Sequence, residues 1–366
     1  MPFNLWLTYS IMNMKELKGC TLKEIQDFVE SLGEKKFRGT QIYKWIYGKY
    51  AQNFEVMSDI SRNFKSVLSQ TAKISNLSIA STKKSQDGSI KFLFKLDDNL
   101  FIESVLIPAF DKRLTLCIST QVGCLLGCKF CATGYMGFQR NLTTGEIVDQ
   151  LIQVQKTCDE RITNIVLMGM GEPLQNYENV IKAVKIINDG DGLKIGARHI
   201  TLSTAGCADK IYQLAEEKIQ FKLAISLNSM DNSKRTEIMP ITNKYPVNVL
   251  LDAVRYYYEK TRRRPTFEYI LFDGFNDSVD DVKALIQLGK RIPCKINLIA
   301  YNPIDFILPE SKELSFKPAP DPRIELFADA LRRGGLTVMI RKSLGRDING
   351  ACGQLAISKK QKEGEF

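Results

Sequence analysis

The chain has 366 residues, of which 44% are hydrophobic and 25% are charged, a composition that excludes wholesale disorder and allows a substantial core. Its formal net charge of +10 favours a polyanionic partner such as nucleic acid, because lysine and arginine side chains placed against phosphates release condensed counterions. A single histidine, His199, excludes multi-histidine metal sites, and nine irregularly spaced cysteines favour metal or redox chemistry over a disulfide framework.

The first residues give no signal for secretion. Residues 1–13 are mildly apolar but have no positive charge ahead of them, so we interpret them as a poorly structured N-terminal extension rather than a signal peptide. No apolar run in the chain is long enough to span a bilayer. We therefore expect no membrane partner and a cytoplasmic location.

The segment from about residue 21 to 72 is predicted to be helical. Thr21 can cap the run TLKEIQDFVESLG, in which apolar residues recur at helical spacing. The next run, KKFRGTQIYKWIYGKY, mixes basic and aromatic side chains, which can hold a nucleic-acid backbone and stack on bases. An amphipathic helix that turns Ile42, Trp45 and Ile46 toward a small core explains the same pattern, and both interpretations can hold at once.

Residues 75–107 change to the period of a strand. The alternating runs SNLSIAST and IKFLFKL flank the turn-forming segment KKSQDGS, and this arrangement predicts a β-hairpin. The run FIESVLIP extends the strand pattern toward the rest of the chain.

From about residue 114 onward, short β-rich runs alternate with helical stretches. The predicted strands are LTLCIS, TNIVLMG, RHITLST, KLAISL, TFEYILF, KINLIA and LTVMIR. The predicted helices lie near residues 144–157, 177–188, 208–218, 247–260, 278–291 and 323–333. Such repeats imply an α/β fold with a parallel sheet, arranged as a barrel or an open part-barrel. The active site of such a fold lies at the carboxyl ends of the strands.

Three cysteines follow the first of these strands in the run QVGCLLGCKFCATG. Cys124, Cys128 and Cys131 have the spacing C-x3-C-x2-C, and three thiolates can hold three irons of a [4Fe–4S] cluster. The fourth iron is then free to bind a small chelating molecule. A zinc site is the alternative, with Cys117 or His199 as the fourth ligand, but the spacing departs from that of paired zinc knuckles. For His199, inside a strand-like run, a structural role is the expectation.

The cysteine motif, with the aromatic Phe130 before its last cysteine, resembles that of the radical S-adenosylmethionine (SAM) superfamily. The resemblance extends to the RlmN-type methyltransferases of the RlmN/Cfr family, which act on C2 of adenosine in ribosomal and transfer RNA. The motifs that carry it cover nearly the whole chain after Met14: FRGTQIYKWIY, TLCISTQVGCLLGCKFCATG, GFQRNLT, LMGMGEPLQN, ITLSTAG, LAISL, KINLIAYNP and ACGQL.

The resemblance implies a domain organisation, cofactors and partners. An N-terminal accessory RNA-binding domain would span residues 14–100 and contain the helices and the β-hairpin. A partial (β/α)6-type radical SAM barrel would span residues 101–355. A C-terminal tail would span residues 356–366. The implied cofactors are a [4Fe–4S] cluster and two SAM molecules per turnover. Implied partners are 23S rRNA at the peptidyl transferase centre, tRNA next to the anticodon, and a one-electron donor such as flavodoxin. We expect a monomer.

The resemblance also implies which residues bind SAM. The matching positions, beside the cluster ligands Cys124, Cys128 and Cys131, are Gly171, Glu172, Ser203, Ser226, Leu227, Asn228 and Asn302. Asn228 stands where the family has a histidine. Taken singly, the serines would be read as residues that cap strand ends, and the glycine-rich GMGEP run as an ordinary turn.

Two further cysteines and a carboxylate have roles implied by the resemblance. Cys352 is methylated on sulfur by one SAM, and a 5′-deoxyadenosyl radical from a second SAM takes a hydrogen from that methyl group. The resulting methylene radical adds to adenine C2 and ties the base covalently to Cys352. Glu103 accepts the C2 proton, and Cys117 attacks the Cys352 sulfur to form a disulfide. The alternatives are buried apolar thiols for the cysteines and a surface strand carboxylate for Glu103.

Two other functions compete with this one. A Cfr-like enzyme would methylate C8 of adenosine, but the QVGC and GEP motifs favour the C2 type. A zinc-stabilised RNA-binding protein without catalytic activity is the alternative from another class.

Overall fold

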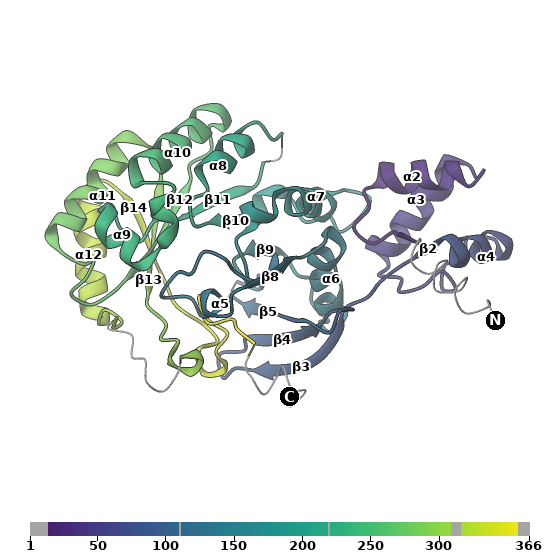
Figure 1. Ribbon diagram of the computed structural model, residues 1–366, viewed down its shortest axis with the longest axis horizontal. Coiled ribbons are helices and arrows are strands. Elements are labelled where there is room, and N and C mark those ends of the chain that lie inside the picture. The colour runs from purple at the N-terminus through teal and green to yellow at the C-terminus, as the bar shows by residue number, and fades with distance from the viewer. Residues whose placement is uncertain (1–13, 110, 219, 309–315, 358–366) are drawn as a thin grey trace. The chain divides into compact units, whose positions relative to one another are not determined.

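The computed structural model describes residues 14–109, 111–218, 220–308 and 316–357 (Figure 1). The predicted N-terminal extension and nearly all of the predicted tail lie outside these residues. Contacts divide the chain into two compact units that interleave in sequence. The first unit is formed by Met1–Ser78, Leu142–Arg161 and Glu178–Gly196. The second unit is formed by Ile79–Asn141, Ile162–Tyr177 and Ala197–Phe366. The predicted domain boundaries at residues 100 and 355 stay predictions, and the contacts group the hairpin strands with the second unit.

The first unit is largely helical, as predicted for residues 21–72. Its elements are β1 (Lys15–Glu16), α2 (Leu22–Ser31), α3 (Lys36–Tyr43), the π-helical turn η1 (Lys44–Gly48), α4 (Arg62–Thr71), β2 (Ala72–Lys73), α6 (Thr144–Gln155) and most of α7 (Tyr177–Asn188). Thr21 caps α2 in a reciprocal capping box with Glu24, which confirms the predicted start of this helix.

The run KKFRGTQIYKWIYGKY of the first unit has some side chains in a buried core and others on the surface. Ile42 and Ile46 are fully buried, as the amphipathic interpretation predicted. Trp45 is partly buried; its indole N–H donates to Asp59, and the Lys49 ammonium lies 3.7 Å from the ring centroid. The interpretation that Trp45 faces the core therefore holds only in part. Phe37, at 52% exposure, lies outside the core.

The second unit is built on one ten-stranded sheet. Seven neighbouring strands pair in parallel: β6 (Leu114–Cys117), β9 (Asn164–Leu167), β10 (Ile200–Thr204), β11 (Lys222–Ser226), β12 (Thr266–Leu271), β13 (Lys295–Ala300) and β14 (Thr337–Arg341). Beyond β6 the sheet continues with β5 (Phe101–Pro108), β4 (Ile90–Lys95) and β3 (Ser78–Lys84). Within the residues that the structure describes, the sheet runs from β14 to β3 and these two strands do not pair, so the barrel is a partial one.

Helices connect the parallel strands, as repeated β–α units require. In the sequence, α6 lies between β6 and β9, and α7 lies between β9 and β10. From β10 to β14 the connecting helices are α8 (Ala208–Ala215), α9 (Asn232–Ile238), α10 (Val247–Thr261), α11 (Val279–Arg291) and α12 (Asp321–Arg333), and Figure 1 shows these five along the β10–β14 end of the sheet. The short helix α9 was not predicted. Within the described residues, no helix is long and apolar enough to cross a membrane.

Candidate active site

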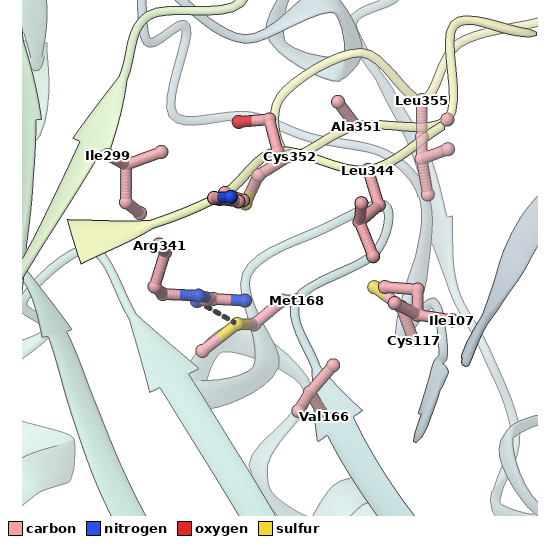
Figure 2. A pocket seen from close by; sticks show the side chains of 13 residues that line it. Ile107, Cys117, Val166, Met168, Ile299, Arg341, Leu344, Ala351, Cys352 and Leu355 are labelled. Atoms are coloured by element: carbon pink, nitrogen blue, oxygen red, sulfur yellow. Dashed lines mark hydrogen bonds between the residues drawn. The ribbon is translucent and has the colours of Figure 1, made fainter. Parts of the chain in front are cut away.

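Two neighbouring pockets open at the carboxyl ends of the parallel strands. The first, here the rim pocket, holds about 670 Å³ of space free of protein atoms, and residues that line it include Cys131, Glu172, Ser203 and Ser226. The second, here the cysteine pocket, holds about 620 Å³ and is lined by Cys117, Cys352 and their neighbours (Figure 2). Four residues line both pockets: Met168, Ile299, Arg341 and Cys352.

The three cysteines of the C-x3-C-x2-C motif lie in a loop that a small hairpin closes. Strands β7 (Gln121–Gly123) and β8 (Phe138–Asn141) pair in antiparallel fashion, and the loop between them ends in the short helix α5 (Ala132–Tyr135). The Cys124 N–H donates to the carbonyl of Gly137 over 3.1 Å. Gly123 has a φ of +74°, and a side chain there would collide with the Gly137 carbonyl, so the close approach requires glycine.

Burial raises the pKa of all three motif cysteines. Burial raises the pKa of Cys124 to about 12 and raises that of Cys131. For Cys128, burial and then the charges of Cys131 and Cys124 raise the pKa well above its usual value. The charges of Cys131 and Cys124 act on Cys128, so the three sulfurs lie within electrostatic reach of one another. Iron bound here would replace the thiol protons, as metal binding to cysteine does elsewhere.

A single-ion site is not evident at the motif. In the described part of the chain, no three histidine, cysteine, aspartate or glutamate side chains are grouped closely enough to hold one metal ion. An iron–sulfur cluster differs in that each thiolate binds a separate iron, so the sulfurs are spread around a larger group. His199 lies in a short 3-10 helix, Ala197–His199, before the start of β10, whereas the motif follows the carboxyl end of β6. The structure therefore does not bring His199 to the three cysteines.

Gly171 and Glu172 lie in the turn after β9 and line the rim pocket. A Cβ on Gly171, whose φ is +98°, would come within 2.5 Å of the Gln121 side chain. The Glu172 carboxylate accepts the N–H groups of Leu174 over 3.0 Å and Ala205 over 2.7 Å. Burial raises its pKa, which these hydrogen bonds oppose. A buried carboxylate fixed in this way at a pocket can accept a cationic amino group.

The other predicted SAM-binding residues divide into two groups. Ser203 and Ser226, at the ends of β10 and β11, line the rim pocket. Leu227, Asn228 and Asn302 are buried and line neither pocket. Their predicted contact with the cofactor stays a prediction.

The two buried asparagines support residues that do line the pockets. Asn228 donates to the Ser226 hydroxyl over 2.9 Å and accepts the Ile270 N–H over 2.9 Å. Asn302 donates to the carbonyl of Cys352 over 3.1 Å and accepts from the Arg346 guanidinium over 2.9 Å. Each side chain is thereby fixed behind a residue that faces a pocket.

Cys352 lies in the loop after β14, and this loop is bonded to the cysteine motif. The Ala132 N–H donates to the carbonyl of Gly353 over 2.7 Å, and the Thr133 hydroxyl donates to that of Leu355 over 2.6 Å. Cys352 is exposed to solvent within the pockets, yet the protein around it raises the pKa of its thiol, with the charge of Arg341 acting in the opposite direction. These bonds place Cys352 beside the loop of the three cysteines.

Cys117, at the carboxyl end of β6, lines the cysteine pocket together with Cys352 (Figure 2). Burial raises the pKa of Cys117 to about 12, the nearby Cys352 adds to the rise, and Arg341 opposes it. The structure thus gathers two predicted catalytic cysteines around one cavity.

Glu103 lies on β5 and is fully buried, so its interpretation as a surface carboxylate was wrong. The β5–β6 register pairs Val105 with Cys117, which turns Glu103 to the same face of the sheet as Cys117. Its carboxylate lies 3.0 Å from the Lys91 ammonium and accepts the Ala356 N–H over 3.1 Å. Glu103 lines neither pocket, so its predicted role as the proton acceptor stays a prediction.

Sequence reasoning missed the charged pair of the pockets. Arg341 lies 3.4 Å from the Glu268 carboxylate and 3.8 Å from the sulfur of Met168 (Figure 2). Glu268 also accepts from the Asn297 amide over 3.0 Å. The sequence offered one signal for this pair. Glu268 is the one acidic residue of the apolar strand run TFEYILF, and Arg341 is the one basic residue of LTVMIR.

Comparisons with known proteins agree with this arrangement. Residues 15–74 match the family model of the ribosomal RNA large subunit methyltransferase N-terminal domain, and residues 118–288 match that of the radical SAM superfamily. A probable dual-specificity RNA methyltransferase RlmN from Clostridium novyi (strain NT) is 47% identical over 343 residues, which cover 93% of this chain and 98% of that protein. The chain belongs to the RlmN family.

Two further comparisons extend this finding. A probable RlmN from Cytophaga hutchinsonii is 44% identical over 96% of this chain and 95% of its own length. The crystal structure of a radical SAM methyltransferase from Sphaerobacter thermophilus superposes with a TM-score of 0.86 at 38% identity, covering 93% of this chain and 99% of that one. This RlmN-family chain is therefore a SAM-dependent RNA methyltransferase with the radical SAM fold, a family that uses a [4Fe–4S] cluster. The alternative of a non-catalytic RNA-binding protein was wrong.

Proposed function

We propose that the chain methylates C2 of adenosine in 23S rRNA and tRNA, with Cys352 as the carrier of the methyl group. The observation that supports this best is the position of Cys352, which lines both the rim pocket and the cysteine pocket. A carrier has to meet the cofactor first and a resolving thiol later. Cys131 and Glu172 line the rim pocket together with Cys352, and Cys117 lines the cysteine pocket together with Cys352.

The cofactors would be held at the rim pocket by residues already described. Cys124, Cys128 and Cys131 would bind three irons of the cluster, which supplies the electron for cleaving SAM. Glu172 would accept the amino group of SAM, and the hydroxyls of Ser203 and Ser226 would bind its other polar groups. Two SAM molecules per turnover are part of this proposal, one as methyl donor and one as radical source.

Adenine C2 requires a carrier because it is electron-poor and has no lone pair that can attack a sulfonium methyl group. The Cys352 sulfur can take the methyl group by displacement and then lose one of its hydrogens to a radical. Desolvation raises the pKa of the Cys352 thiol, and the charge of Arg341 opposes this rise and so favours the thiolate that performs the displacement. Addition of the methylene group to C2 would leave the RNA bound to Cys352.

Release of the RNA would use Glu103 and Cys117. Glu103 would take the C2 proton, and the ammonium of Lys91 lies 3.0 Å from its carboxylate. The adduct radical would give up one electron to a one-electron acceptor such as the oxidised cluster. The thiolate of Cys117 would then attack the Cys352 sulfur and form a disulfide, and the released methylene carbon of the base would take a proton to become the methyl group.

The first unit would bind RNA through its exposed basic and aromatic side chains. Lys35, Lys36, Lys44 and Lys49 are exposed on the same segment as Phe37. Lysines of this kind bind phosphates without regard to sequence, and an exposed ring can stack on a base. A one-electron donor such as flavodoxin, a monomeric state and a cytoplasmic location complete the proposal.

Incubation of the reduced enzyme with RNA and methyl-deuterated SAM, followed by mass spectrometry of the nucleosides, tests this function. We expect 2-methyladenosine with one exchanged methyl hydrogen, no product from Cys352→Ala, and a covalent RNA adduct trapped in Cys117→Ala. The product 8-methyladenosine would instead support a Cfr-like activity. Full activity of either cysteine variant would refute the assigned roles.

A further inference from the structure

Arg235 is the largest fully buried side chain of the described residues, and it lies on α9. Its guanidinium donates to the carbonyls of Leu227 over 3.0 Å, Ala205 over 2.6 Å and Ser226 over 3.2 Å. It also donates to the Thr242 hydroxyl over 2.8 Å. All four acceptors are neutral groups.

No carboxylate of the described chain forms an ion pair with Arg235, and this distinguishes it from other buried cations. Lys18 has Asp149 at 2.7 Å, and Lys91 has Glu103 at 3.0 Å. A buried charge without a counter-charge costs several kcal/mol. Hydrogen bonds to carbonyls offset only part of this cost, and burial accordingly lowers the pKa of Arg235 to about 10.

Hydrogen bonds link Arg235 to the rim pocket and its helix to the cysteine motif. Two of the acceptors of Arg235, the carbonyls of Ala205 and Ser226, belong to residues that line the rim pocket together with Cys131. The N–H of Lys129, next to Cys128, donates to the carbonyl of Ile238 at the end of α9 over 3.0 Å. The helix that carries Arg235 is thus fastened to the motif.

We propose that Arg235 is the buried counter-charge of the iron–sulfur cluster and sets its reduction potential. Three thiolates and a [4Fe–4S] core together carry net negative charge, and accepting one electron makes this charge more negative by one. A fixed positive charge in a region of low dielectric stabilises the reduced form more than the oxidised form. Arg235 therefore raises the potential and makes reduction by a one-electron donor easier. This inference requires that the chain binds the [4Fe–4S] cluster of the radical SAM family, and it does not depend on which adenine carbon is methylated.

Redox titration of the reconstituted, RNA-free protein with dithionite, followed by electron paramagnetic resonance, tests the role. We compare Arg235→Gln, which removes the charge, with Arg235→Lys, which keeps it. In Arg235→Gln the ratio of reduced to oxidised cluster at a fixed potential should fall about tenfold, which corresponds to about 59 mV for a one-electron couple. Arg235→Lys should recover most of the wild-type ratio.

Lys234→Gln is the matched control on the same helix. Lys234 is half-buried and already paired with Asp281 at 2.9 Å, so its removal should leave the ratio unchanged. An unchanged potential in Arg235→Gln, or an equal fall in Arg235→Lys, would overturn the proposal. Should the glutamine variant fail to hold iron, retention of the cluster by Arg235→Lys supports the need for charge, whereas equal loss from both variants refutes it. None of these outcomes depends on RNA methylation, so they are separate from the test of the proposed function.

Discussion

The guanidinium of Arg341 lies 3.4 Å from the carboxylate of Glu268, and this ion pair reaches from β14 to β12 across the strand between them. Asn297 on that middle strand stands opposite Glu268 in register and donates to it. The pair fixes a positive charge in the wall shared by the two pockets. The pKa of both pocket thiols is raised, by burial at Cys117 and by the protein around the exposed Cys352, and the charge of Arg341 opposes both rises.

Arg341→Met should destabilise the protein, because the buried Glu268 carboxylate then keeps Asn297 but loses its cation. We expect a loss of about 2 kcal/mol in the free energy of unfolding, measured by urea denaturation of the metal-free protein. The double variant Arg341→Met/Glu268→Gln should recover part of this loss, since no buried charge remains. Strictly additive losses in the two single variants would contradict the coupling.

The two pocket cysteines should differ in reactivity. In the metal-free protein at neutral pH, iodoacetamide should label the exposed Cys352 well before the buried Cys117. With a pKa of about 12, Cys117 should react about tenfold faster for each unit of pH up to that value, because only the thiolate reacts. Peptide mass spectrometry at successive times measures both rates, and equal labelling of the two cysteines at pH 7 would be inconsistent with the described burial.

Glu172→Gln should change the response of stability to pH. Burial raises the pKa of Glu172 above its usual value of 4.5, so the folded protein keeps this proton to a higher pH than the unfolded chain does. The unfolding free energy of the wild type therefore falls as pH rises from 4.5 through the raised pKa, and the glutamine variant lacks this contribution. Denaturation curves over this window, with the exposed Glu237→Gln as control, measure the difference.

The same variant should weaken binding of SAM, if Glu172 accepts its amino group. Isothermal titration calorimetry of the cluster-loaded protein should give a dissociation constant raised about tenfold or more, since a charge-assisted hydrogen bond contributes roughly 1.5–3 kcal/mol. An unchanged affinity for SAM would show that Glu172 does not bind the amino group of this cofactor.

Lys91→Met should be more damaging than an equivalent change on the surface. The substitution takes the ammonium away from the fully buried Glu103 carboxylate, and we expect a loss of about 3 kcal/mol in unfolding free energy. Lys95→Met, an exposed position on the same strand, should change stability by less than about 0.5 kcal/mol. Similar losses of unfolding free energy in both variants would show that the ion pair of Lys91 and Glu103 contributes no more to stability than an exposed lysine does.

The sequence predicted the strands well, because each parallel strand is a short apolar run. It missed α9, whose seven residues contribute only Arg235 and Ile238 to the buried interior and so give no apolar period. It also missed the β7–β8 hairpin, in which the strands have three and four residues and the pairing depends on close glycine backbones. Such elements are specified by tertiary contacts rather than by a local pattern.

The candidate site was predictable where its residues stand in short motifs. The cysteine loop, Gly171, Glu172 and the strand-end serines all lie at the predicted carboxyl edge of the sheet. The ion pair of Arg341 and Glu268 was not predictable, because it joins two residues distant in sequence. Burial of Asn228 and Asn302 behind the pocket walls depends on side-chain packing that a motif does not express.

The hydrogen bond between Thr133 and Leu355 joins residues separated by 222 positions. Closing a loop of this length costs chain entropy, because its two ends must be held together. The strands from β9 to β14 lie inside this loop, and their pairing brings the two ends closer and so reduces that cost. The contact between the loop of Cys352 and the cysteine motif therefore depends for its stability on the sheet that lies between them in the sequence.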